Sequence, residues 1–347
     1  MNICHVNLAS GFSGGERQTL QLIHQQLRLG YRLVVVANPA SPFYREVDKL
    51  DCQLVSATHY LKQHSRSITQ DCQLIHVHEG RAIYWALIQS VISGLPYLVT
   101  RRIDNPLKKK WLSQLAYSKA SALIGLSNEI VSQLKKRHPS QAHYLIPSSP
   151  VSYPVHQQQV EQIKQRFKGK FLVIQAANLL KHKGHNVSIN AAKALAQCCP
   201  NVHIALLGDG PEKDTLQQQA QGLNNLSFEG KQSNMGDWFA AADMLIHPSY
   251  SEGLGSVILE AIQSGLPVAA SKAGGIPDII DGTSSGLLIE PGHHEQLAQH
   301  IVAVQSNPEL KQQLIDGGQA KMQYFDIAHT ANLYQNVYQQ VISDGQH

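Results

Sequence analysis

Two glutamates and a Gly-rich turn form the segment of the sequence best suited to chemistry. Glu252 opens the turn, and Glu260 follows about two helical turns later. The amides of Gly255, Ser256 and Val257 would begin a helix and face a phosphate. Because carboxylates accept hydrogen bonds from hydroxyls, Glu252 suits a sugar and Glu260 a ribose. An exposed structural role for Glu260 is disfavoured, since its neighbours are almost all apolar.

A lysine at the head of a predicted helix is the second candidate. Lys183 lies next to last in the segment 177–184, which follows an apolar, β-branched run. There its charge and the helix dipole could act together on a diphosphate. The alternative is a solvated basic loop.

A Gly-rich turn near the N-terminus is the third candidate. Gly14 and Gly15 lie in the segment 11–16, between a predicted strand and a predicted helix. Glycines let a backbone approach a phosphate closely, although such a turn can also simply be tight. The segment lacks the GxGxxG pattern, which disfavours a dehydrogenase.

The charge of the 347-residue chain is unevenly distributed. Residues 1–160 hold 17 Lys+Arg against 8 Asp+Glu, whereas residues 161–347 hold 12 against 17, for a total of +4. The basic half indicates an anionic partner, or else a solvated basic face. No nucleic-acid recognition motif accompanies it.

Cysteines and apolar runs indicate a cytoplasmic protein. The five cysteines are odd in number and form no CxxC pair, so we expect reduced thiols. The longest weakly polar run, 84–99, is too short and too interrupted to cross a bilayer, and no secretory signal is evident. His76 and His78 would share one face of a strand, and such a pair is more often structural than metal-binding.

Short apolar runs alternate with amphipathic stretches along the whole chain, which predicts parallel sheets covered on both faces. The Pro- and Ser-rich stretch 146–154 reads as a linker. We therefore expect an α/β protein with two doubly wound domains facing across a cleft. Their bounds would be 1–150 and 151–325, with a terminal helix at 326–347 packing near the interdomain region. The predicted strands are 3–8, 32–37, 74–77, 97–100, 122–126, 144–146, 171–175, 203–207, 226–228, 244–247 and 267–270.

Taken together, these motifs resemble the family 4 retaining glycosyltransferases, which have the GT-B fold. The stretch 252–261 resembles the family's EGFG-x4-E signature, and 265–268, 274–278 and 286–288 resemble the segments that follow it. The stretches 14–17 and 30–34 resemble the family's GGxER and GHxV segments. Such an ordered series is far more specific than any one match.

The resemblance implies a donor held mainly by the second domain and an acceptor held mainly by the first. Lys183 would hold the diphosphate and Glu260 the ribose, while Glu252 would lie near the donor sugar. Gly14 and Gly15 would close over the phosphates. The resemblance further implies transfer with retained configuration, no cofactor and no metal, in agreement with the lack of an Asp-x-Asp motif.

Two departures from the family pattern stand out. Asn178 takes the place of the family's diphosphate-binding arginine, and Lys181 or an arginine of the other domain could substitute. Arg102 takes the place of a histidine near the donor sugar, and we predict that it acts on the sugar or the diphosphate. Arg101 beside it is expected on the acceptor side.

Acceptor contacts are also expected from His78 and Glu79, although a buried structural histidine is an equal alternative. The basic cluster Lys108-Lys109-Lys110 beside Trp111 suits an anionic membrane or a lipid-linked acceptor. A further basic set, 135–137, lies at a predicted helix end, where cations also cap the dipole. We therefore expect peripheral contact with the inner face of the cytoplasmic membrane.

The function predicted is transfer of a sugar from a UDP- or GDP-linked donor to a glycan or lipid-linked acceptor. Lipopolysaccharide, capsule or another surface glycan would be the product. A nucleotide-sugar epimerase and a non-catalytic nucleotide-sugar binder are the alternatives, and the losses at Asn178 and Arg102 favour the binder.

Overall fold

A computed structural model describes residues 1–102 and 110–345 and divides the chain into two compact units. Unit 1 comprises Met1–Val151 with the C-terminal segment from Tyr324 onwards, and unit 2 comprises Ser152–Gln323. The chain thus passes between the units within the Pro- and Ser-rich stretch and returns to unit 1 through its last helix.

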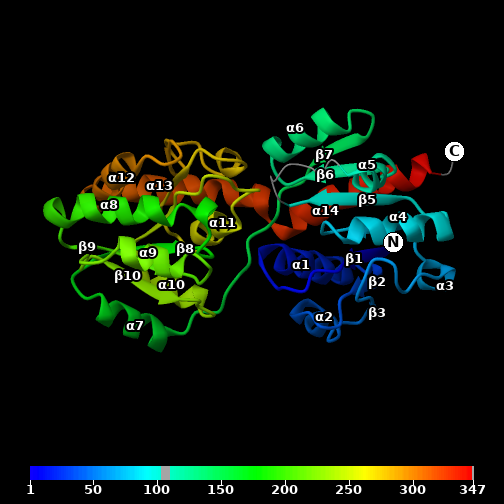
Figure 1. The fold of residues 1–347 in the computed structure, drawn as a ribbon, viewed down its shortest axis with the longest axis horizontal. Coiled ribbons are helices and arrows are strands. Elements are labelled where there is room, and N and C mark those ends of the chain that lie inside the picture. Colours follow the sequence, from blue (N-terminus) through cyan, green and yellow to red (C-terminus); the bar gives the residue numbers. More distant parts are fainter. Residues whose placement is uncertain (103–109, 346–347) are drawn as a thin grey trace. The chain divides into compact units, whose positions relative to one another are not determined.

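Unit 1 is built on a seven-stranded parallel sheet in the order β3-β2-β1-β4-β5-β6-β7 (Figure 1). Every predicted strand of this half is present, and one strand was missed at residues 53–56. The strands are β1 (Asn2–Asn7), β2 (Arg32–Ala37), β3 (Gln53–Ser56), β4 (Leu74–Val77), β5 (Tyr97–Arg101), β6 (Ala122–Gly125) and β7 (Ala142–Leu145). Most of the central positions are buried, as β-branched runs covered on both faces require.

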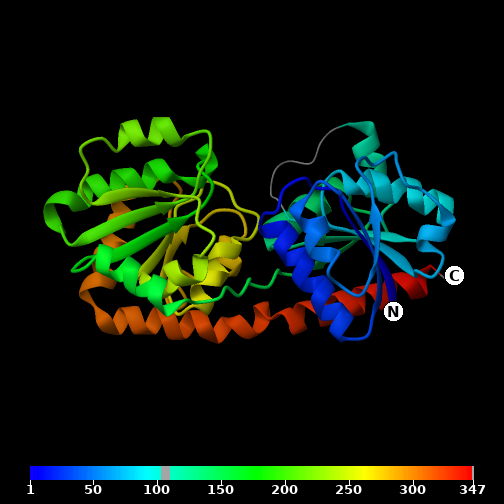
Figure 2. The same cartoon turned by 90° about the horizontal axis from the view of Figure 1, so that it is seen from below.

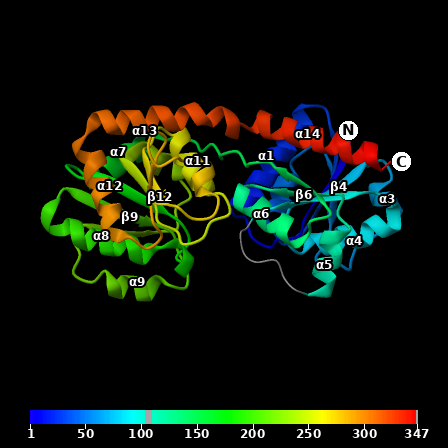
Figure 3. The same cartoon turned by 90° about the horizontal axis from the view of Figure 1, so that it is seen from above.

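The helices of unit 1 lie on both faces of this sheet. They are α1 (Gly14–Arg28), α2 (Pro42–Val47), α3 (Arg66–Thr69), α4 (Ala82–Ser93), α5 (Trp111–Ser118), α6 (Asn128–Arg137) and α14 (Ile327–Asp344). The last helix, α14, runs beside α1 (Figure 3). Its apolar face, which includes Tyr334, Val337 and Tyr338, joins the core formed by β1, β2 and α1. The C-terminal helix is therefore part of unit 1's core.

Unit 2 has a six-stranded parallel sheet in the order β10-β9-β8-β11-β12-β13, with helices on either side (Figure 2). Its strands are β8 (Phe171–Ala176), β9 (Val202–Leu207), β10 (Leu226–Gly230), β11 (Met244–His247), β12 (Val268–Ser271) and β13 (Leu287–Ile289). Its helices are α7 (Gln157–Arg166), η1 (Lys181–Lys183), α8 (His185–Cys198), α9 (Lys213–Gln219), α10 (Met235–Ala241), α11 (Ser256–Gln263), η2 (Ile276–Asp278), α12 (His294–Ser306), α13 (Pro308–Lys321) and η3 (Met322–Phe325, which runs on into unit 1).

Both sheets are doubly wound, as predicted. The strand order changes direction between β1 and β4 in unit 1 and between β8 and β11 in unit 2. Loops that leave the carboxyl ends of the two strands at such a point diverge, which leaves room for a ligand. Within the described ranges, no helix has both the length and the apolar character needed to span a bilayer.

Candidate functional site

Lys183 and Glu252 meet at the point where unit 2's strand order reverses. Lys183 ends the short η1 helix after β8, Glu252 follows β11, and β8 pairs directly with β11. The Lys183 ammonium donates to Glu252 Oε2 over 2.5 Å, and each side chain keeps less than a fifth of its surface exposed. Residues 69 positions apart are therefore brought together by the topology of the sheet.

Close backbone packing fixes the loop that carries Lys183. Gly184 has φ +69, and a Cβ there would lie 1.9 Å from the carbonyl oxygen of Pro248, so only glycine fits. The Gln175 side chain donates to the carbonyl of Lys183 over 2.8 Å and accepts from the Ser188 hydroxyl over 2.7 Å. Lys183 thus sits on a backbone held from both sides.

Glu252 is held as a carboxylate by its neighbours. Burial favours the neutral acid, but the hydrogen bonds and charges of His247 and Lys183 outweigh it and lower the pKa of Glu252 to about 2. His247 Nε2 lies 2.9 Å from Glu252 Oε2 and 3.0 Å from the Ser249 hydroxyl. His247 was not predicted as a site residue, because a strand-end histidine carries no signal until its partner is known.

The start of α11 lies directly beyond Glu252. Gly255 precedes the helix with φ +99, and Ser256 and Val257 supply its first amides, which have no acceptor within the helix. Gly274 (φ +53) packs against the Glu252 carbonyl, where a Cβ would come within 1.8 Å. The start of α11 therefore lies against Glu252, the partner of Lys183.

Glu260 is buried on α11, as the apolar character of its neighbours predicts. It is 7% exposed and accepts a hydrogen bond from the Tyr153 hydroxyl over 3.3 Å.

Asn178, by contrast, is exposed on the loop between β8 and η1, and Lys181 is exposed on η1 itself. Their predicted part in diphosphate binding stays a prediction.

In unit 1, Gly14 and Gly15 are the first residues of α1, whereas we expected them in the preceding turn. The helix begins earlier because the Glu16 carboxylate accepts from the Ser13 amide and hydroxyl, over 2.8 and 2.6 Å. A Cβ on Gly15 would lie 3.3 Å from Arg102 Cδ, so this glycine lets Arg102 approach the head of α1.

Arg102 lies between the head of α1 and the end of unit 1's sheet. Its guanidinium donates to Gln18 and Ser148 over 3.0 and 3.1 Å, and to Thr19 and His78 over 3.4 and 3.3 Å. These four partners are neutral groups. The side chain also lines a small pocket formed by Gln18, Leu22, Pro147, Ser148, Ser149, Ile327, Thr330 and Tyr334.

The three predicted acceptor-side residues lie in different surroundings. Arg101 is 9% exposed and donates to the Tyr117 hydroxyl over 3.3 Å. Glu79 accepts from the amides of Arg81 and Ala82 over 2.7 and 2.8 Å and so holds the start of α4. His78 is 2% exposed. Contact with an acceptor stays a prediction for all three.

His78 belongs to a buried cluster with His5 and His76, the only group of metal-ligand type found among the described residues. The His76 and His78 rings lie 3.9 Å apart, in keeping with the shared face predicted for them. Burial lowers the pKa of His5 to about 4 and, together with the neighbouring histidines and Arg102, holds those of His76 and His78 well below 6.5. The three rings are therefore neutral at pH 7. The sequence gives no sign of His5, which lies 71 residues from His76.

Solved structures place this fold in a known class. The crystal structure of Anabaena HepE in complex with UDP superposes with a TM-score of 0.84, over 98% of this chain and 100% of that one, at 21% identity. The two doubly wound units therefore have the GT-B fold, as predicted.

The sequence comparison supplies the family. Residues 157–321 match the family described as glycosyl transferases group 1. The chain is 36% identical over 149 residues to the sulfoquinovosyl transferase SQD2 of Arabidopsis thaliana, covering 39% of this chain and 29% of that protein. It is 31% identical over 151 residues to LpsD, a lipopolysaccharide core biosynthesis glycosyltransferase of Rhizobium meliloti, covering 43% of each. These alignments span less than half of the relatives' length. Unit 2 therefore matches the glycosyl transferases group 1 family, as the sequence motifs predicted.

Proposed function

We propose that the protein is a retaining glycosyltransferase that takes its sugar from a nucleotide-diphosphate donor. The observation that carries this proposal is the Lys183–Glu252 pair beside the start of α11. A cation, a helix N-terminus and a fixed carboxylate together suit a diphosphate joined to a sugar.

Each group then has a distinct task. Lys183 and the amides of Ser256 and Val257 stabilise the charge that develops on the departing diphosphate. Glu252, held ionised, accepts from a hydroxyl of the donor sugar, and Glu260 accepts from the ribose. The bond from the sugar's C1 to the diphosphate oxygen breaks, and C1 bonds to the acceptor oxygen on the same face. The acceptor's proton leaves with the diphosphate, whose oxygens can take it.

Arg102 is assigned to the sugar or the diphosphate as a fixed charge. Its fork-shaped guanidinium is held by Gln18 and Ser148, so its direction is set before a ligand arrives. An Arg102→Lys variant should lose turnover at saturating donor, because a lysine cannot keep this geometry. Full turnover in that variant would remove Arg102 from the mechanism.

Donor binding and turnover test the proposal directly. A thermal-shift panel with UDP and GDP should show stabilisation by one of them, and Lys183→Ala should abolish it. Lys193→Ala, which removes an exposed lysine on α8, is the matched control and should bind like the parent. Slow hydrolysis of the corresponding nucleotide sugar supports a transferase. Inversion at C2 or C4 would instead show an epimerase, and binding without turnover a binding protein.

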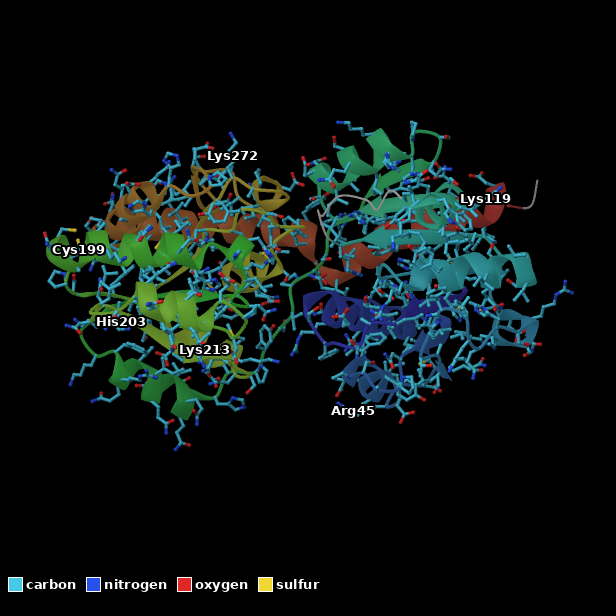
Figure 4. The ribbon with its side chains drawn as sticks, in the orientation of Figure 1. Arg45, Lys119, Cys199, His203, Lys213 and Lys272 are labelled. Carbon is cyan, nitrogen blue, oxygen red and sulfur yellow. The ribbon has the colours of Figure 1, made fainter. Side chains whose placement is uncertain are left out.

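Surface glycan synthesis is the proposed setting, supported by the likeness to LpsD. Trp111 is 74% exposed and Leu115 38%, one turn apart on α5, with the exposed Lys110 before them. The exposed Lys119 follows them, and Figure 4 shows its side chain. Lys108 and Lys109 of the predicted basic cluster lie outside the described residues. We propose that this face of α5 contacts an anionic membrane. Cosedimentation with phosphatidylglycerol vesicles should fall with salt and in Trp111→Ser; salt-insensitive or absent binding would count against it.

A further inference from the structure

A buried chain of hydrogen bonds begins at Arg102 and crosses the core of unit 1. Arg102 reaches Nδ1 of His78 over 3.3 Å, and His78 Nε2 lies 2.8 Å from His5 Nδ1. His5 Nε2 in turn lies 2.7 Å from Gln26 Oε1 on α1. His5, His78 and Gln26 are each at most 2% exposed, so solvent does not compete for these contacts.

The chain continues from α1 to the C-terminal helix and back to the sheet. Gln26 Nε2 lies 3.1 Å from the Tyr338 hydroxyl, which lies 2.7 Å from His76 Nδ1. His76 Nε2 lies 2.8 Å from the Thr100 hydroxyl, which lies 3.0 Å from that of Tyr334. Thr100 stands two residues before Arg102, so the chain ends close to where it began.

The hydrogen bonds from Arg102 to Gln26 can run in one donor-to-acceptor direction only, and Arg102 sets that direction. A guanidinium has donors and no acceptor, so His78 Nδ1 must accept. A neutral His78 then carries its proton on Nε2 and donates it to His5 Nδ1. His5 must likewise carry its proton on Nε2, which donates to the Gln26 carbonyl oxygen.

The second half follows from the first. With its oxygen turned to His5, Gln26 presents its NH2 group to the Tyr338 oxygen. The single proton of Tyr338 is then left for His76 Nδ1, so His76 also carries its proton on Nε2 and donates to Thr100. All three histidines are thereby fixed in the Nε2–H form.

A metal ion fits this cluster poorly. One nitrogen from each histidine lies within 4.8 Å of the others, which is close enough for shared ligation. All six ring nitrogens, however, have hydrogen-bond partners, and the chain leaves no acceptor nitrogen over. A cation would also stand beside the charge of Arg102.

We propose that His78, His5, Gln26 and Tyr338 are positioning residues that aim the Arg102 guanidinium through this one-directional chain. The proposal rests on the proposed function in assigning Arg102 to the donor, whereas the chain itself stands on geometry alone. The proposal also gives the C-terminal helix α14 a role in positioning Arg102, because its Tyr338 hydroxyl joins Gln26 to His76.

Nitrogen-15 NMR of selectively labelled histidine tests the chain without any donor. The parent protein should show the Nε2–H form at His5, His76 and His78. In Gln26→Glu, the carboxylate accepts from both His5 and Tyr338, so His76 must donate from Nδ1 to the Tyr338 oxygen. Only His76 should therefore switch to the Nδ1–H form. A proton on Nδ1 of His5 or His78 in the parent protein would contradict the proposed direction of the hydrogen bonds and overturn the proposal.

Turnover tests the positioning. The probe is hydrolysis of UDP-glucose, the sugar nucleotide held by a solved structure of HepE. His5→Phe removes the acceptor of His78, and kcat should fall about tenfold while KM changes less than about twofold, as expected for a displaced catalytic group. His5→Asn keeps an acceptor oxygen near Nδ1 and should recover most of the loss. Equal kcat in both variants would overturn the positioning role.

Two controls separate the outcomes. Tyr97→Phe removes another buried hydroxyl of unit 1, which donates to the Ala116 carbonyl outside the chain, and it should leave kcat and the histidine forms unchanged. Addition of Zn2+ should neither raise the melting temperature nor alter the histidine signals; if it does both, the cluster is a metal site and the proposal is wrong. If Lys183→Ala leaves UDP-glucose turnover intact, the proposed function fails. The NMR experiment still tests the hydrogen-bond chain in that case, because it needs no donor.

Discussion

The Lys183 ammonium and the Glu252 carboxylate face each other over 2.5 Å at the carboxyl ends of β8 and β11. In this state each group neutralises the other. Under the proposed function, a donor diphosphate that engages Lys183 would draw it partly away from Glu252, and the freed carboxylate oxygen would then accept from a sugar hydroxyl. We therefore expect the pair to link diphosphate binding to sugar recognition.

Glu252→Gln should separate these roles. Loss of the charge removes a charged hydrogen bond between two mostly buried side chains and should lower the free energy of unfolding by about 2 kcal/mol. Turnover of the donor should fall by roughly 10- to 100-fold, with UDP binding retained through Lys183. Urea unfolding, isothermal titration with UDP and donor hydrolysis measure the three quantities.

Glu229→Gln is the matched control for that experiment. Glu229 forms an ion pair with Arg166 over 2.6 Å at the edge strand β10, away from the site. Its loss should leave turnover unchanged. Parent-like turnover in Glu252→Gln itself would exclude the carboxylate from the mechanism.

Gly184→Ala should be strongly destabilising. Both the positive φ and the approach of the Pro248 carbonyl oppose a Cβ at this position, so we expect a loss of roughly 3 kcal/mol in the free energy of unfolding. Gly222→Ala has a similar φ of +84 with open space around it, and it should lose only about 1 kcal/mol. Urea titration of both variants gives the two losses in the free energy of unfolding, and their difference is the contribution of the clash with Pro248. Equal losses would mean that the Pro248 contact is dispensable.

The histidine cluster predicts a loss of stability in mild acid. Folding lowers the pKa of His5 from 6.5 to about 4, so the unfolded chain binds the proton more tightly. Stability is therefore full above pH 6.5 and falls as the pH drops toward 4, by roughly 3 kcal/mol for this group alone. His76 and His78 shift in the same direction and steepen the fall.

Urea unfolding at a series of pH values between 7.5 and 4.5 measures this slope. His5→Asn removes one titrating group and should flatten it by about one proton. His24→Asn is the comparison, because His24 is exposed on α1 and lies outside the hydrogen-bond chain. A slope that His5→Asn leaves untouched would show that His5 is already protonated or solvated in the folded protein.

The sequence was informative where pattern is local. Apolar, β-branched runs located the strands β1, β2 and β4 to β12 within a few residues, and an apolar helix face around Glu260 predicted its burial. The edge strands β3 and β13 were missed, because β3 is partly exposed and β13 is only three residues long.

Side-chain partnerships between distant segments could not be read in advance. His247 matters through Glu252 and Lys183, and Gln26 through residues 312 positions away. Such contacts depend on which strands become neighbours, and the strand order is a property of the whole fold. Glycine patterns were the partial exception, since Gly184 and Gly15 mark close approaches that a sequence can flag without naming the partner.

Asn178→Arg should strengthen donor binding. The position is exposed on the loop before Lys183, and in the family pattern an arginine there contacts the diphosphate. A second cation should contribute about 1 kcal/mol, or roughly fivefold in the Kd for UDP, and the gain should shrink as salt rises. Asn224→Arg adds the same charge at the exposed amino end of β10, opposite the carboxyl-end loops, and should leave UDP binding unaltered. Isothermal titration at low and moderate salt distinguishes the two variants. An unchanged Kd in Asn178→Arg would place the diphosphate away from this loop, and it would leave Lys183 as the cation of unit 2 on which the proposed site depends.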